Sequence, residues 1–164
     1  MAGARTRSGM SDAIAIRRGT VRDRAFVIDL GRRVSPTSVS SLRIALPPLV
    51  EGAYERLVEY VLAREHDVLI AESGGVAAGF ALLIYDLPDE ITLTEQAFVA
   101  YMAVEPAMQR RGVGGELLAS IEEHARKRGL PYLSLMVTEE NTAARELYAG
   151  AGFITERRMM TKAL

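Results

Sequence analysis

The sequence predicts an α/β fold built on a mixed β-sheet. Its 164 residues are 49% hydrophobic and 25% charged, which is the size and composition of one ordinary globular domain. Segments with helical periodicity alternate with short apolar segments, in the order β-α-α-β-β-β-α-β-α-β. A strand at 97–104, an amphipathic helix at 113–128 and a strand at 132–137 form a βαβ unit. We therefore expect these two strands to be parallel and joined in the right-handed sense.

The N-terminal half is expected to contribute three strands of the sheet and two helices. Thr20 and Asp23 form a variant of the capping box, which predicts the start of a helix. Pro48 suits the first turn of a second helix, because its missing N–H has no partner there. Gly74 and Gly75 are typical of a tight hairpin. The expected elements are a strand at 13–17, a helix at 25–33, a loop at 35–41, a helix at 48–65, and strands at 68–72 and 76–85.

The C-terminal half opens with a loop at 86–96 that has four acidic residues and no basic one. The nearly all-apolar segment 97–104 should be a strand buried on both faces. A turn rich in Gly and Arg follows it, and the next helix should end at Gly129, because glycine favours the C-terminal cap. The remaining expected elements are a strand at 132–137, a short helix at 142–149 and a closing strand at 153–162.

Composition and charge exclude several function classes. A net charge of −1 argues against a dedicated nucleic-acid binder, although 18 of the 20 basic residues are arginine. The absence of cysteine excludes a disulfide scaffold, a thiolate zinc site and a cysteine nucleophile. His66 and His124 lie far apart without ligand spacing, so no metal site is expected.

The chain is expected to be one domain of a cytoplasmic protein. No apolar run approaches ~18 residues, so we expect no membrane-spanning segment. Residues 1–12 lack the apolar core of a secretory signal and are expected to form a disordered tail. The single domain should then cover residues 13–164.

The turn at 109–115, Gln-Arg-Arg-Gly-Val-Gly-Gly, is the strongest functional signal. Its three glycines permit positive φ and close approach of a ligand. The helix that follows leaves about four N–H groups unpaired, at the positive end of its dipole. These features suit a diphosphate, with Arg110 and Arg111 adding positive charge at the entrance. The alternative is a glycine-rich turn that binds nothing.

Two common phosphate-binding patterns do not fit this turn. A P-loop needs Gly-Lys followed by Ser or Thr at the helix start, and here Gly115 is followed by Glu116. The dinucleotide pattern Gly-x-Gly-x-x-Gly needs a glycine at the position of Leu117. A different phosphate-bearing ligand is therefore indicated.

Residues 109–114 fit the pattern Gln/Arg-x-x-Gly-x-Gly/Ala and resemble motif A of the GCN5-related N-acetyltransferase (GNAT) superfamily. A second segment, Asn141 to Tyr148 followed by Gly152 and Phe153, is similar to the family's Asn-x-x-Ala-x-x-x-Tyr-x-x-x-Gly-Phe segment. The resemblance covers residues 97–164, and before residue 97 it rests on the order of elements alone. It implies a twisted, mostly antiparallel sheet with a parallel βαβ pair at the cofactor cleft and helices on both faces.

The resemblance also implies roles for individual residues. The turn would hold the diphosphate of acetyl-CoA as co-substrate, and the preceding strand would pair with the pantetheine arm, which requires it to separate from the strand at 132–137. Asn141 is either a helix cap or a hydrogen-bond partner of the pantetheine amide. Tyr148 is either a half-buried core aromatic or the acid that protonates the departing thiolate. The implied cofactor-binding residues are Met102, Ala103, Val104, Arg110, Arg111, Gly112, Val113, Gly114, Gly115 and Asn141.

The implied activity is acetyl transfer from acetyl-CoA to an amine of a small molecule or peptide, by direct attack in a ternary complex. Without cysteine or an apparent Ser-His pair, no covalent enzyme intermediate is expected. Where some relatives carry a glutamate base, the chain has Phe98 and Met136. Glu90, Glu95, Glu105 or water chains remain as candidates, none of them assigned. The acidic segment is either a solvated edge, which is the favoured interpretation, or an attractant for a cationic amine.

Two alternatives stay open beside the enzyme. One is a non-catalytic acyl-CoA sensor or pseudoenzyme, which would keep the turn but need no base. The other, an arginine-rich RNA-associated domain, is disfavoured by the near-neutral charge. Since family members are often dimers, the resemblance also allows a homodimer.

Overall fold

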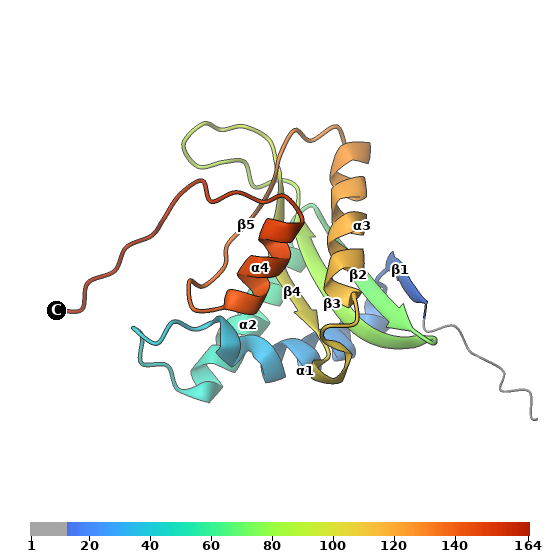
Figure 1. Ribbon diagram of the computed structural model, residues 1–164, viewed down its shortest axis with the longest axis horizontal. Coiled ribbons are helices and arrows are strands. Elements are labelled where there is room, and N and C mark those ends of the chain that lie inside the picture. The colour runs from blue at the N-terminus through green and yellow to red at the C-terminus, as the bar shows by residue number, and fades with distance from the viewer. Residues whose placement is uncertain (1–12) are drawn as a thin grey trace, which may run out of the picture.

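The computed structural model describes residues 13–164 and has a five-stranded sheet between two helical layers (Figure 1). The expected tail at 1–12 lies outside the described residues. The elements in chain order are β1 (Ile14–Arg18), α1 (Arg24–Val34), α2 (Pro47–Leu62), β2 (His66–Ser73), β3 (Val76–Ile84), β4 (Ala97–Val104), α3 (Val113–Lys127), β5 (Leu133–Leu135) and α4 (Thr142–Gly150). Short 3₁₀ turns occupy Val21–Asp23, Ser35–Ser38 and Pro106–Met108.

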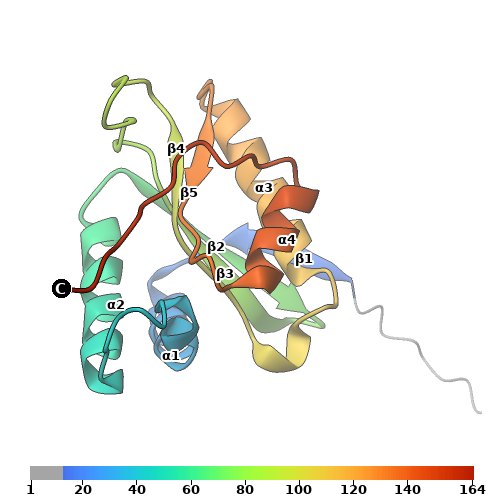
Figure 2. The ribbon, with the colours of Figure 1, turned by 60° about the vertical axis from the view of Figure 1, so that its left-hand side comes forward.

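The sheet confirms the expected topology. Its strands lie in chain order from β1 to β5, antiparallel throughout except for the last pair, β4 and β5, which is parallel. Helices α1 and α2 cover one face, whereas α3 and α4 cover the other (Figure 2). The parallel pair is joined through α3, as the βαβ pattern predicted.

Each face of the sheet has its own hydrophobic core. Leu117, Leu118 and Ile121 of α3 are fully buried against one face. Val58 and Val61 of α2 are buried against the other face, around Phe80 of β3. β3 is buried over most of its length because it lies in the middle of the sheet. The apolar residues of α2 and α3 therefore recur with helical spacing because each helix buries one side against its core.

Two expectations about strands were wrong. The described residues 153–164 contain no strand, although a closing strand was expected at 153–162. β5 pairs over only three residues and offers this segment no continuous ladder. β4 is also less buried than expected: only Ala97, Val99 and Ala103 are fully buried, since the strand loses its β5 neighbour after Val99.

The capping box is present at the start of the 3₁₀ turn Val21–Asp23, which leads into α1, and is reinforced by an arginine. The Thr20 N–H donates to Asp23 Oδ2 at 2.7 Å, and Arg22 N–H donates to Thr20 Oγ1. Arg17 donates to both carboxylate oxygens of Asp23, at 2.7 and 2.9 Å. These donors hold the pKa of Asp23 well below its ordinary value, with the Arg17 guanidinium as the main cause.

Replacing Asp23 with asparagine should lower stability at neutral pH by about 1–2 kcal/mol, through loss of the cap and ion pair. Because the pKa of Asp23 is lower in the folded than in the unfolded state, its contribution is complete above the unfolded value of ~3.9 and is lost as pH falls below it. Urea denaturation at several pH values would measure this. The difference between Asp23→Asn and wild type should shrink in acid; a difference independent of pH would contradict the assignment.

Gly31 of α1 makes room for the ring of Tyr54. A Cβ at this position would lie 1.9 Å from Cζ of Tyr54, which is fully buried and donates its hydroxyl to the Val27 carbonyl oxygen. The α1–α2 contact therefore requires a glycine here for space, because the helix itself would favour alanine.

Gly31→Ala should destabilise the chain by about 1–3 kcal/mol, since it overpacks the contact between α1 and α2. Gly52→Ala in α2 is the matched control, because its Cβ would meet only the Arg56 side chain, at 3.5 Å. That control should gain up to about 1 kcal/mol from helix propensity. Urea denaturation of both variants would measure the effect, and equal stabilities would contradict the packing explanation.

Candidate active site

The central feature of the site is the separation of β4 from β5. The two strands pair only where Ala97, Phe98 and Val99 face Leu133, Ser134 and Leu135. Beyond Val99, β4 keeps its antiparallel partners on β3 but has none on β5. The backbone of Met102, Ala103 and Val104 is therefore open on its β5 side, as pairing with an extended ligand requires.

A β-bulge in β4 coincides with this separation. Opposite β3, Leu82 pairs with Tyr101 and Leu83 pairs with Val99, which leaves Ala100 as an extra residue. A bulge bends the strand and reverses the facing of the residues after it. Val99 accordingly packs in the α3 core, whereas Tyr101 packs toward α1 and α2.

Tyr101 is a site residue that the sequence reasoning missed. Its hydroxyl lies 3.3 Å from Ser38 Oγ, and its ring centroid lies 4.9 Å from that of Tyr54. Burial raises the pKa of Tyr101, so the phenol stays protonated at neutral pH. The available signal was a tyrosine in an otherwise apolar strand, but the bulge that orients it has no local signature.

The turn after β4 presents unpaired amides to the same end of the sheet. Helix α3 starts at Val113, and no side chain caps it. The Glu116 N–H donates to the Gly112 carbonyl at 3.1 Å, so the N–H groups of Val113, Gly114 and Gly115 precede the first intrahelical bond. The positive end of the helix dipole lies at the same place.

The three glycines of the turn differ in conformation and surroundings. Only Gly112 has positive φ, which corrects the expectation that all three glycines would use it. Gly112 has φ of 89°, and Arg110 is a second residue with positive φ, at 62°. Gly114 lies within α3, where a Cβ would be 2.8 Å from Leu147 of α4. Gly115 is also helical and faces open space. Thus Gly112 shapes the turn, Gly114 permits close packing with α4, and Gly115 leaves room for a ligand.

Both arginines of the turn are exposed at its outer surface. Arg111 Nη1 donates to Met108 Sδ at 3.4 Å. Arg110 stands one residue earlier, at the strained point of the turn. Together with the amides of α3, they make a compact cationic surface, which is chemically suited to a diphosphate.

Glu105, a candidate base, is occupied by an arginine from α1. Arg33 donates to both of its carboxylate oxygens, at 2.6 and 3.2 Å. Hydrogen bonds to Glu105 and Asp29 raise the pKa of Arg33. Glu105 therefore anchors the start of the turn to α1 through this ion pair.

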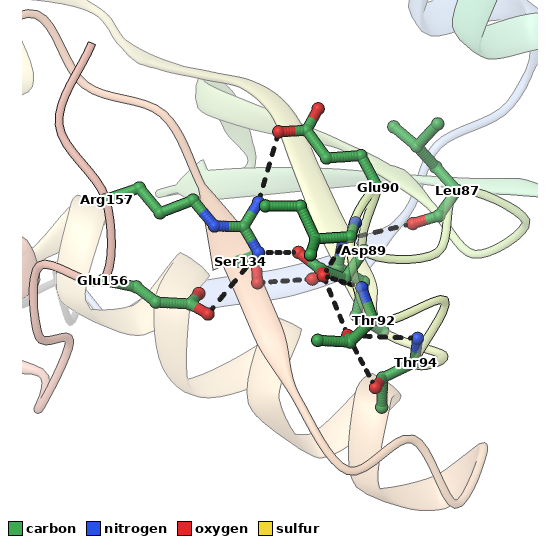
Figure 3. Close-up of polar contacts among 10 residues, drawn as sticks. Leu87, Asp89, Glu90, Thr92, Thr94, Ser134, Glu156 and Arg157 are labelled. Carbon is green, nitrogen blue, oxygen red and sulfur yellow. Dashed lines mark hydrogen bonds and ion pairs between the residues drawn. The ribbon is translucent and has the colours of Figure 1, made fainter.

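Three of the four carboxylates of the acidic segment 86–95 pair with two arginines, and Glu95 makes no ion pair within residues 13–164, so the segment keeps a net negative charge. Asp86 pairs with Arg64 at 3.1 Å. Arg157 of the C-terminal segment points between Asp89 and Glu90 and contacts both, the latter at 3.2 Å (Figure 3). Asp89 also accepts hydrogen bonds from Thr92, which contribute most to lowering its pKa.

Asn141 caps α4, which is the first of the two roles expected for it. Its Oδ1 accepts a hydrogen bond from the Ala144 N–H at 3.2 Å. Among the described residues, its side-chain NH₂ makes no hydrogen bond, so capping leaves that donor available. The capping role and a role toward a ligand amide are therefore compatible.

Tyr148 lies on the inner side of α4, half-buried against the α3 core. Its ring packs edge-on against Phe153, with centroids 5.8 Å apart. Its hydroxyl makes no hydrogen bond with other residues of the part that the structure describes. Burial raises the pKa of Tyr148, and a nearby Tyr101 adds to this effect. Both phenols therefore stay protonated at neutral pH.

Two loops are clamped together beside these phenols. Thr138 Oγ1 donates to the Ser38 carbonyl at 2.6 Å. Glu140 accepts hydrogen bonds from the Ser41 N–H at 3.0 Å and from Ser41 Oγ at 2.7 Å, and these donors lower its pKa. The clamp joins the segment between α1 and α2 to the segment before α4, which could not be expected from local sequence.

Both histidines lie in structural roles. His66 Nδ1 is 2.7 Å from the Arg64 carbonyl, and His124 Nδ1 is 2.7 Å from the Ser120 carbonyl. Within residues 13–164, no group of three or more His, Asp or Glu side chains is arranged to hold a metal ion. Over the same range, no helix has the length and apolarity needed to cross a membrane.

Comparison with known proteins identifies an acetyltransferase family and an N-acetyltransferase relative. A family model described as Acetyltransferase (GNAT) family matches residues 40–153. Over 62 residues the chain is 37% identical to the ribosomal protein bS18-alanine N-acetyltransferase of Haemophilus ducreyi. That alignment covers 38% of this chain and 43% of the relative, so the chain spans less than half of that protein's length.

Solved structures share the fold. A putative acetyl transferase from Pyrococcus furiosus superposes with a TM-score of 0.78 at 23% identity, covering 93% of this chain and all of that chain. The aminoglycoside acetyltransferase AAC(6')-Iy, solved with a bisubstrate analogue of CoA and acetylneamine, gives a TM-score of 0.65 at 20% identity. The superposition covers 93% of this chain and 98% of the AAC(6')-Iy chain.

Proposed function

The chain belongs to the acetyltransferase (GNAT) family, and from this premise we propose that it transfers the acetyl group of acetyl-CoA to an amine of a small molecule or peptide. One observation carries the proposal: unpaired helix amides, from Val113 onward, directly follow a strand that is open along one side. A diphosphate followed by an extended amide-bearing arm needs both features, in this order.

The residues of the chain fit acetyl-CoA as co-substrate. The amides of residues 110–115, with Arg110 and Arg111, would bind the diphosphate. The open backbone of residues 102–104 would pair with the pantetheine arm, and the Asn141 NH₂ would donate to one of its amides. The CoA adduct bound by AAC(6')-Iy supports coenzyme A as the acyl carrier.

The reaction we propose is direct transfer without an enzyme-bound acyl group. Acetyl-CoA supplies the activated acyl group. Main-chain N–H groups of the open part of β4 would polarise the thioester carbonyl, as oxyanion-hole donors do. Tyr148, protonated and without a hydrogen-bond partner among the described residues, would donate a proton to the departing sulfur. With no cysteine in the chain, the amine would attack the thioester carbon itself.

A second candidate is an acyl-CoA sensor without turnover. It is favoured by the pairing of two of the three candidate bases: Glu105 is paired with Arg33 and Glu90 with Arg157, whereas Glu95 is exposed and makes no ion pair within residues 13–164. Met136, at a position where some relatives carry the base, is exposed. In the enzyme, the acceptor amine would lose its proton to water.

Calorimetry and a CoA-release assay would separate the candidates. The enzyme should bind acetyl-CoA and release CoA with at least one member of a panel of monoamines, polyamines, aminoglycosides and peptides. Binding without release from any member would favour the sensor. No binding of acetyl-CoA or CoA would refute both.

A further inference from the structure

The segment between α1 and α2 has an unusual surface. Residues 35–50 contain a single charged side chain, that of Arg43. The large apolar side chains of Leu42, Ile44, Leu46 and Leu49 are between 62% and 102% exposed. A continuous exposed apolar segment of this kind marks a binding surface more often than scattered single residues do.

A hollow of about 240 Å³ lies within this segment. Its walls are apolar, from Pro36, Val39, Ala45, Pro47 and Val50, with Ser40 and Ser41 as neutral polar groups. Arg43 is the only charged residue that lines it, and within residues 13–164 its side chain makes no ion pair. The hollow therefore suits an apolar group with a carboxylate close to it.

The segment is fixed beside the proposed acyl site. Ser38 contacts the Tyr101 hydroxyl and, through its carbonyl, Thr138. Ser41 is held by Glu140, just before α4. Figure 1 shows this segment alongside the connection that enters α4, which carries Tyr148. The hollow therefore lies on a segment that contacts β4 through Tyr101 and the connection to α4 through Glu140.

The charges around this segment do not suit a polycation. The nearby carboxylates are mostly ion-paired: Glu51 and Glu55 share Arg32, Asp29 and Glu105 share Arg33, and Glu139 pairs with Arg145. Glu140 is the exception, since it accepts hydrogen bonds only from the neutral groups of Ser40 and Ser41. A polyamine or aminoglycoside carries several ammonium groups and needs several unpaired carboxylates. The observations therefore favour a mostly apolar acceptor with at most one or two charges.

We infer that the acceptor is an extended peptide whose free α-amine is acetylated while an apolar side chain fills the hollow and an acidic side chain pairs with Arg43. This inference rests on the proposed acetyl transfer. In that reaction a C–N bond forms at the α-amine and the thioester C–S bond breaks. One proton leaves the amine, and the sulfur receives one.

The test is a set of pentapeptide amides with free N-termini. Ala-Leu-Asp-Leu-Gly should be acetylated with a kcat/KM about tenfold above its Ala-Ser-Asp-Ser-Gly counterpart, from partial burial of one leucine. It should exceed Ala-Leu-Asn-Leu-Gly by about threefold, the effect of one exposed ion pair. Spermidine and neamine should be poorer than all three peptides. Equal rates for the peptides, or a polycation as the best acceptor, would overturn the inference.

Two variants distinguish a loss of peptide binding at Arg43 from a general loss of structure or activity. Arg43→Gln should abolish the preference for aspartate over asparagine and leave acetyl-CoA affinity unchanged. Arg56→Gln, on the exposed surface of α2, is the matched control and should keep the preference. If Arg43→Gln lowers kcat/KM equally for peptides and for a small monoamine, its role is structural and the inference is wrong.

Peptide binding is also measured without turnover. The same peptides, labelled at the C-terminus, would be titrated by fluorescence anisotropy in the presence of CoA. Binding that depends on Arg43 but yields no CoA release would support the docking surface while refuting the proposed function. Absence of peptide binding, with a monoamine still acetylated, would refute the docking surface alone.

Discussion

Replacing Gly112 with alanine should lower the affinity for acetyl-CoA by at least about tenfold, the effect of roughly one charge-assisted hydrogen bond. Gly112 has φ of 89°, a conformation that costs alanine about 1–2 kcal/mol. The turn would relieve this strain by rotating, which would turn the first amides of α3 away from the diphosphate. Calorimetry with acetyl-CoA and with CoA would measure the loss.

The matched control is Gly129→Ala, at the other end of the same helix. Gly129 also has positive φ, at 71°, and a Cβ added to it would have no other atom within 4 Å. Both substitutions should therefore lower stability by a similar amount. Only Gly112→Ala should weaken the binding of acetyl-CoA. Equal affinities in the two variants would contradict a ligand role for the turn.

Replacing Tyr148 with phenylalanine should lower kcat by about 100-fold, the lower end of the range for loss of a general acid. The hydroxyl makes no hydrogen bond with the described residues, so its loss should leave stability and acetyl-CoA affinity nearly unchanged. Because burial raises the pKa of Tyr148, the wild-type phenol stays protonated at neutral pH, and its ionisation should not limit the rate there. Steady-state kinetics with any active amine would measure the effect.

Tyr132→Phe provides the control for the loss of a phenol. Tyr132 lies just before β5 and is 60% exposed, away from the α3 core. The Tyr132→Phe variant should keep the wild-type kcat with the same amine. A Tyr148→Phe variant as active as Tyr132→Phe would remove the proton-donor role and leave Tyr148 as a packing residue.

Much of the fold could be predicted because the spacing of apolar residues along the chain shows which side of each helix or strand is buried. The apolar stripe of α3, from Val113 to Ala125, faces one core, and a 3.6-residue period records this directly. The capping box at Thr20 and the hairpin at Gly74 depend on backbone geometry within a few residues. The prediction of a closing strand was wrong because a strand also depends on a distant neighbour. Residues 153–164 have no neighbouring strand to pair with.

The candidate site was predicted in part for the same reason. The turn at 109–115, Asn141 and Tyr148 could be proposed from the sequence because each belongs to a short motif. Tyr101 was missed because a bulge at Ala100 decides which face it occupies. The partners of Glu105 and of the acidic segment were also missed, since Arg33 and Arg157 lie far away in the sequence.

By itself, the sequence determined the order of helices and strands as far as α4, the two apolar faces and the glycine-rich turn that starts α3. These depend on side-chain periodicity and on backbone preferences that act within one or two turns of chain. Only the tertiary structure decided that β4 parts from β5 just after Val99, that Arg157 pairs with the acidic loop and that Arg43 is the one charged residue lining an apolar hollow. Each of these depends on which distant segments come together, because an ion pair, a strand edge or a hollow exists only between them.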